Sequence, residues 1–130
     1  MTKKRLYYCD HYQIPLPDGH KFPMSKYRLT RDLLTEDGIF QFECAPLADR
    51  GIIELAHDPA YVRQFMDGTI APQAMRRIGF PWSQDLVKRT LASVGGTLAA
   101  AEDALSMRWG GNLAGARIML FAPKVPDSAF

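Results

Sequence analysis

The stretch that decides the fold runs from Trp82 to Gly115 and reads WSQDLVKRTLASVGGTLAAAEDALSMRWGGNLAG. Apolar residues recur in it at spacings of three and four, which predicts one continuous face of an α-helix. That face consists of Val87, Leu91, Val94, Leu98, Ala101 and Leu105. Ser83 is a good N-cap for a helix from about Gln84 to Arg108, because its hydroxyl can accept a hydrogen bond from a free N–H of the first turn.

A glycine pair, Gly95-Gly96, lies in the middle of this predicted helix. Each glycine costs roughly 1 kcal/mol of helix stability relative to alanine. We therefore expect another stretch of backbone to be pressed against the helix at this point. Beyond Gly110-Gly111, the short apolar run Asn112–Gly115 is typical of a buried strand.

The segments before this helix alternate between strand and helix patterns. Strands are predicted at 5–9, 39–44 and 52–56, and helices at about 25–36, 59–67 and 72–78. Asp58 can cap the second of these helices, and Gly38, Gly68 and Gly79 stand at helix ends in the position favoured for a left-handed residue. This order predicts an α/β domain with a mostly parallel sheet.

Length and composition narrow the classes of protein further. A chain of 130 residues that is 47% hydrophobic and 23% charged is one globular domain or part of one. A net charge of only +2 argues against direct contact with nucleic acid, which needs a clustered basic face. No apolar run approaches the ~20 residues of a membrane span, and the start is too short for a signal-peptide core. We therefore expect a cytoplasmic protein in which Cys9 and Cys44 are free thiols.

The residues alone assemble no catalytic site. Neither glycine pair is followed by the lysine of a phosphate loop, and no serine lies in a nucleophile elbow. No two of His11, His20 and His57 have the spacing that places two ligands on one helical face. Hydrogen-bonding roles in loops are the favoured interpretation of these histidines, and a metal site built from all three is the minor alternative.

Several stretches together resemble zinc-dependent deacetylases of the histone deacetylase superfamily, closest to its bacterial and class IV-like branch. The resemblance lies in their order and spacing, because none of them is diagnostic by itself. They are PDGHKFPMSKYR at 17–28, HDPAYV at 57–62, RRIGFPWS at 76–83, VGGTL at 94–98 and NLAG at 112–115.

This resemblance implies a three-layer α/β/α (arginase-like) fold with a mostly parallel sheet. Residues 1–115 would form its N-terminal part, and the fold would be incomplete at the C-terminal side. Members of the family hydrolyse acetyl-lysine or related acetyl-amides, using a zinc ion that activates water and a tandem histidine pair that moves protons. The resemblance also places Met24 and Arg28 along the channel at the foot of the acetate pocket, where a guanidinium suits a leaving acetate.

The chain departs from the family after Gly115. The family would continue Gly-Thr-His-His-Ala, whereas this chain reads ARIML at 116–120. The tandem histidines and the zinc ligands have no counterpart, so the resemblance implies no catalytic residue, no metal ligand and no zinc in this chain. Codons can be chosen for residues 116–130 whose shifted frame encodes Thr-His-His-Ala. We therefore expect residues 116–130 to be an out-of-frame tail that follows a one-base loss near codon 116.

Two functional hypotheses follow. The first is a deacetylase relative that is inactive as it stands, whose intact family acts on acetylated lysine or a small acetyl-amide. The second is a short interaction module that associates with a partner, or with itself, through an open sheet edge. An incomplete α/β/α fold would also expose apolar helix faces, so we expect poor solubility.

Overall fold

The structure is a computed structural model in which residues 3–114 are described. The predicted tail at 116–130 and the end of the predicted last strand at Gly115 lie outside these residues. Its elements are β1 (Lys4–Tyr8), α1 (Lys26–Thr35), β2 (Phe40–Cys44), α2 (Arg50–Ile53), α3 (Pro59–Asp67), α4 (Pro72–Ile78), α5 (Gln84–Met107) and β3 (Gly111–Asn112). The predicted α/β class is confirmed.

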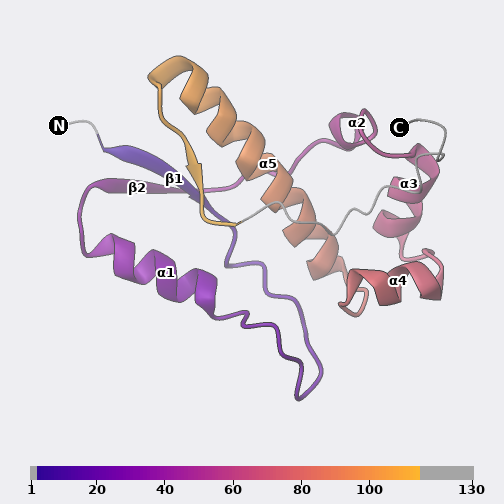
Figure 1. Ribbon diagram of the computed structural model, residues 1–130. Coiled ribbons are helices and arrows are strands. Elements are labelled where there is room, and N and C mark those ends of the chain that lie inside the picture. Colours follow the sequence, from indigo (N-terminus) through magenta and orange to yellow (C-terminus); the bar gives the residue numbers. More distant parts are fainter. Residues whose placement is uncertain (1–2, 115–130) are drawn as a thin grey trace.

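The strands form a parallel sheet, as the sequence predicted, and their order in it is β2-β1-β3 (Figure 1). Leu6 of β1 lies opposite Phe42 of β2 and Gly111 of β3. Successive side chains of a strand point to opposite faces. On one face Tyr7 packs with Ala92 and Ala100 of α5, and on the other face Tyr8 contacts α1. Helices therefore lie on both faces of the sheet.

The expected backbone approach at the glycine pair is confirmed. A side chain at Gly95 would collide with the main chain of Pro46 and Ala48, and one at Gly96 would collide with the Asn112 side chain. Ser83 caps α5 as predicted, with its Oγ accepting a hydrogen bond from the Leu86 N–H at 3.0 Å. Gly95 thus lets the segment after β2 cross α5 at close range, and Gly96 leaves room for the side chain of Asn112 from β3.

The predicted apolar face of α5 is wrong in its C-terminal half. Val87 is buried, but Leu98 is 39% exposed and Leu105 is 88% exposed. The buried residues of this half are Gly96, Ala100 and Asp103, and Ala100 lies against the sheet together with Ala92 of the first half. Since large side chains would hold the helix away from the strands, the small residues decide which side of α5 faces the sheet, and the leucines point elsewhere.

The predicted strand at 52–56 is also wrong, because a single turn of helix, α2, replaces it. Asp49 has an extended backbone and begins the helix, and Arg50 pairs with Glu54 one turn later at 2.7 Å. Ile53 is buried, whereas Leu55 is 86% exposed. Ile53 packs on Val62 of α3. A single buried apolar residue is typical of a helical turn, whereas a half-buried strand would bury alternate residues.

The predicted helix ends hold for α3 and α4, whereas α1 ends at a right-handed Glu36, two residues before the predicted stop at Gly38. Asp58 caps α3 by accepting a hydrogen bond from the Tyr61 N–H at 3.3 Å, and Gly68 and Gly79 end α3 and α4 with left-handed backbones. A core unites α3, α4 and the start of α5 around the fully buried Phe65 and Leu86. These helices lie at one end of the molecule, beyond the carboxyl end of β1 (Figure 1).

Candidate functional site

The carboxyl end of β1 is where a ligand-binding site is expected. In open parallel sheets, ligands bind beyond the carboxyl ends of the strands, where the loops diverge. Here β1 runs directly into Cys9, Asp10, His11 and Tyr12, and the long loop that follows leads to Met24. The loop also supplies residues of the stretch at 17–28 that resembles the deacetylases.

A buried arginine from α5 lies at this end of β1. Arg89 is 3% exposed. Its Nη1 donates a hydrogen bond to the carbonyl oxygen of Tyr12 at 2.9 Å and lies 3.3 Å from the sulfur of Met24. Its guanidinium carbon is 4.3 Å from the centroid of the Tyr27 ring. Three segments that are far apart in sequence therefore meet at one cation.

The charge of Arg89 has no carboxylate partner among residues 3–114. Its hydrogen bonds there involve Nη1 alone, which leaves the donors at Nε and Nη2 for another group. A buried cation without a countercharge is costly, and the ring of Tyr27 only partly compensates for it. The arrangement is suited to hold a small anion, because a guanidinium can donate two parallel hydrogen bonds to a carboxylate.

The two residues expected at the foot of an acetate channel have different surroundings. Met24 is partly buried in the core of α3–α5 and contacts Arg89. Arg28 is exposed on α1. The guanidinium that contacts the sulfur of Met24 therefore belongs to Arg89, which sequence reasoning missed. Its burial could have been inferred from the helical spacing, because Arg89 lies one turn after the buried Leu86 and one turn before the buried Ala92.

Asp10 is buried next to this cluster, but its charge is matched. Arg31 of α1 donates to both of its carboxylate oxygens at 2.7 Å and stacks over the ring of Tyr8. The hydrogen bond from Arg31 to Asp10 raises the pKa of the guanidinium. This bidentate pair ties α1 to the end of β1, and we assign it a structural role.

The thiol of Cys9 is 1% exposed and lies 3.8 Å from the hydroxyl of Ser93. Burial raises the pKa of this thiol above its ordinary value, and the nearby charge of Arg89 opposes that shift. A thiol kept protonated is a poor nucleophile. Cys44 is exposed, and both cysteines are free, as predicted.

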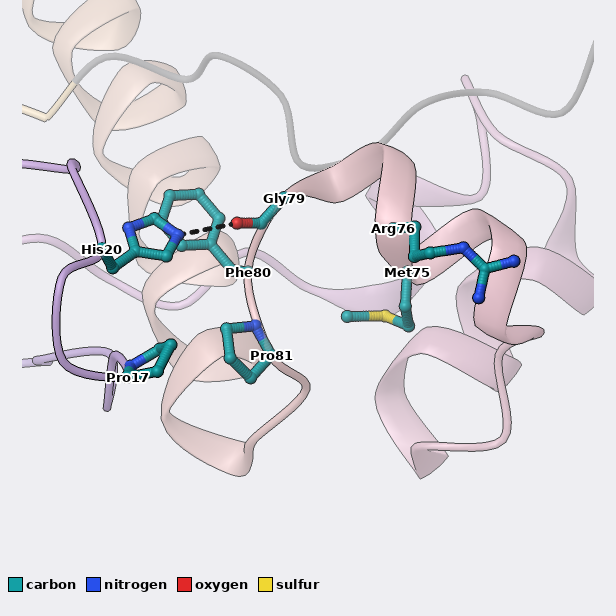
Figure 2. Close-up of a pocket in the computed structure, with 7 residues that line it drawn as sticks. All are labelled: Pro17, His20, Met75, Arg76, Gly79, Phe80 and Pro81. Atoms are coloured by element: carbon teal, nitrogen blue, oxygen red, sulfur yellow. Dashed lines mark hydrogen bonds between the residues drawn. The ribbon is translucent and has the colours of Figure 1, made fainter.

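A pocket of about 360 Å³ lies between the loop after β1 and the turn that joins α4 to α5. Its wall is mostly apolar, with His20 and Phe80 on one side and Met75 with Arg76 on the other (Figure 2). His20 stacks on Phe80, its Nε2 donates to the carbonyl oxygen of Gly79 at 3.0 Å, and its Nδ1 accepts from the N–H of Phe22 at 3.2 Å. The bond to Gly79 therefore joins the two segments, and the bond from Phe22, within the same loop, fixes the orientation of the ring.

The three histidines do not gather. His20 is engaged in the loop contact, His11 lies against the rings of Tyr8 and Tyr12, and His57 lies just before α3. Nδ1 of His57 is buried without a hydrogen-bond partner within the described part of the chain. Over residues 3–114, no three side chains of His, Cys, Asp or Glu come together as a metal site requires.

Comparisons with known proteins add one relative. No model of a known protein family matches the sequence. An uncharacterized protein from the cyanobacterium Picosynechococcus sp. is 47% identical over 111 residues, a match that covers 83% of this chain. The chain spans only 37% of the length of that relative. Between residues 3 and 114, no helix combines the length and the apolar character that crossing a membrane requires.

Proposed function

We propose that this chain is the N-terminal part of a zinc-dependent deacetylase-like α/β/α domain and that it is not catalytic by itself. The observation that best supports the proposal is the contact of Met24 with the buried Arg89 at the carboxyl end of β1. Met24 lies in the stretch that resembles the acetate channel of the family. A parallel sheet with helices on both faces is compatible with the same fold.

In this proposal Arg89 supplies the cation of the acetate channel. Its free donors, Nε and Nη2, would bind the two oxygens of the acetate that deacetylation releases. Tyr27 covers the flat face of the guanidinium, and Tyr12 fixes one end of it through a main-chain carbonyl. The role in the acetate channel that the resemblance implies for Arg28 stays a prediction, and this residue is exposed on α1.

Zinc does not fit the described residues, since no three candidate ligands gather among them. The chemistry of a zinc-activated water and a histidine pair belongs to the proposed longer protein. Its substrate class, acetylated lysine or a small acetyl-amide, rests on the family resemblance alone.

An acetate-release assay tests the proposal. The purified chain and the longer cyanobacterial relative would each be incubated with an acetyl-lysine peptide and an acetylated polyamine, with added zinc and with a chelator. We expect release by the relative that the chelator abolishes, and none by the chain. A relative that binds no zinc and releases no acetate would overturn the family assignment, and release by the chain would overturn its inactivity.

A DNA read through codon 115 and beyond tests the predicted frame change separately. We expect the shifted frame to continue with the histidine pair and, further on, with aspartate and histidine ligands for zinc. A sound frame with no such continuation would refute the frameshift.

Association through a sheet edge is the second candidate function. It is favoured by the position of β2 at an edge of the sheet, and the exposed leucines of α5 add apolar surface that a partner could cover. A pull-down with the tagged chain as bait and the longer relative as prey tests this binding directly. A stable stoichiometric complex would support it, whereas a chain that binds neither the relative nor itself would refute it.

A further inference from the structure

The outer edge of β2 carries a row of backbone groups that the sheet leaves unpaired. In a parallel pair, alternate residues bond to the neighbouring strand. Lys4 donates to the carbonyl of Ile39 at 3.0 Å, and Ala45 donates to the carbonyl of Tyr8 at 2.8 Å, so the odd-numbered residues of this segment face β1. Phe40, Phe42 and Cys44 therefore direct their N–H and C=O groups outward, and no backbone group among residues 3–114 meets them there.

This edge matches a second copy of itself. If two β2 strands run antiparallel about a twofold axis at Phe42, then Phe42 lies opposite Phe42, and Phe40 lies opposite Cys44. The outward N–H and C=O groups of these three residues then all find partners on the other copy. A twofold contact uses the same patch on both subunits, and only a self-complementary strand can satisfy it.

The side chains agree with this register. On the face of the sheet that carries α5, Gln41 would lie opposite Glu43 of the second copy, so an amide donor meets a carboxylate on both sides of the axis. The same two side chains already lie 3.4 Å apart within one chain. On the other face, the half-buried rings of Phe40 and Phe42 would meet the corresponding surface of the second copy.

Nothing in the sequence of β2 protects this edge. Natural edge strands avoid pairing through lysine, proline, bulges or a covering segment. The five residues of β2 include one charge, Glu43, and it is drawn toward Arg5 of the neighbouring strand at 3.7 Å. Ile39, directly before β2, is 50% exposed.

We propose that two copies of this chain associate through antiparallel pairing of their β2 strands, with Phe42 on the axis. The product is one continuous sheet with three strands from each copy. This inference deepens the second candidate function by naming the edge and the partner. It does not depend on the deacetylase proposal.

An engineered disulfide tests the register on the full chain. Phe40→Cys places a thiol opposite Cys44 of the second copy, and directly opposed residues of a hydrogen-bonded antiparallel pair have Cα atoms about 5.5 Å apart, which suits a disulfide. Within one chain, positions 40 and 44 are roughly 13 Å apart along the strand, so they cannot join. Cys9 is too deeply buried to compete.

The matched control is the double variant Phe40→Cys, Cys44→Ser, which keeps the new thiol and removes its partner. After mild oxidation of the centrifuged soluble fraction, we expect a covalent dimer from the single variant and none from the control or the wild type. Equal cross-linking of variant and control, or none in either, would overturn the proposed register. Because the readout needs little protein, poor solubility does not prevent it.

Sedimentation equilibrium measures the dimer dissociation constant independently, with variants at the exposed Gln41. Gln41→Glu would oppose two carboxylates across the axis, and Gln41→Lys would create two ion pairs. We expect the dimer dissociation constant to rise about fivefold in the first variant and to fall about fivefold in the second. A chain that stays monomeric at high micromolar concentration would overturn the proposal. A dimer whose dissociation constant changes in neither variant would also overturn it, and would indicate that the two copies bind through another surface.

Discussion

The carbonyl oxygen of Pro46 occupies the space that a side chain at position 95 would need. The segment after β2 crosses α5 at this point, and the N–H of Ala48 donates to the carbonyl of Leu91 at 2.9 Å. That carbonyl is the one a helix would normally pair with the N–H of residue 95. The crossing segment is thus hydrogen-bonded to the helix where glycine lets the two backbones meet.

Replacement of this glycine should therefore destabilise the protein. Gly95→Ala gains helix propensity but forces Pro46 away from α5, and we expect the free energy of unfolding to fall by about 2 kcal/mol. Gly51→Ala is the matched control, because Gly51 lies in α2 with open space around it. We expect that variant to unfold within about 0.5 kcal/mol of the wild type. Urea denaturation of the soluble chain measures both, and equal losses would contradict the role of the contact.

The features of the fold that could be predicted from the sequence are local ones. The cap at Ser83 and the stops at Gly68 and Gly79 depend on residues within a few positions of one another. Gly95 lowers the stability of the helix, so a compensating contact could be expected there without knowing which segment makes it. Such features can be inferred without knowing how the elements are arranged in space.

The features that could not be predicted depend on that arrangement. The run Ile52–Ala56 is too short for its apolar pattern to distinguish a strand from a helical turn. Its packing on α3 determines which of the two forms. Which side of α5 faces the sheet depends on the short distance between the helix and the strands. That distance leaves room for Ala92 and Ala100 but not for Leu98. Arg89 was missed for the same reason, because charge on a helix predicts exposure unless the fold encloses it.

The buried thiol of Cys9 should make stability depend on alkaline pH. Burial raises its pKa above the ordinary value of 9.0 in the folded protein. Below pH 9 both states keep the proton, so the full stability is present. As the pH rises further, the unfolded chain loses the proton first, and the free energy of unfolding falls, by about 1 kcal/mol between pH 8 and 10.

Denaturation of two alanine variants at pH 8 and pH 10 isolates this contribution. Cys9→Ala should lose less stability across this interval than the wild type. Cys44→Ala should remove a separate part of the alkaline loss, because the hydrogen bond from Cys44 raises the pKa of Tyr8. An unchanged pH dependence in Cys9→Ala would assign the alkaline loss to other groups.

The two arginines near Met24 should differ sharply on substitution. Arg89→Met removes the hydrogen bond to the part-buried carbonyl of Tyr12 and the contact with the Tyr27 ring. We expect it to lower the free energy of unfolding by about 2 kcal/mol. Arg28→Met changes an exposed side chain and should stay within about 0.5 kcal/mol. Thermal denaturation followed by circular dichroism compares them, and similar losses would indicate that Arg28 also makes an important contact.

The exposed leucines of α5 should limit solubility more than stability. Leu98 and Leu105 point away from the small-residue side of the helix that meets the sheet, so they contribute little to the core of the described residues. The double variant Leu98→Glu, Leu105→Glu should therefore increase the soluble fraction severalfold while the free energy of unfolding changes by less than about 1 kcal/mol. Leu55→Glu is the control, because Leu55 is as exposed as Leu105 but follows α2 and is not part of α5. If Leu55→Glu improves solubility as much as the double variant, general hydrophobicity explains the effect, and the outer side of α5 has no special part in association.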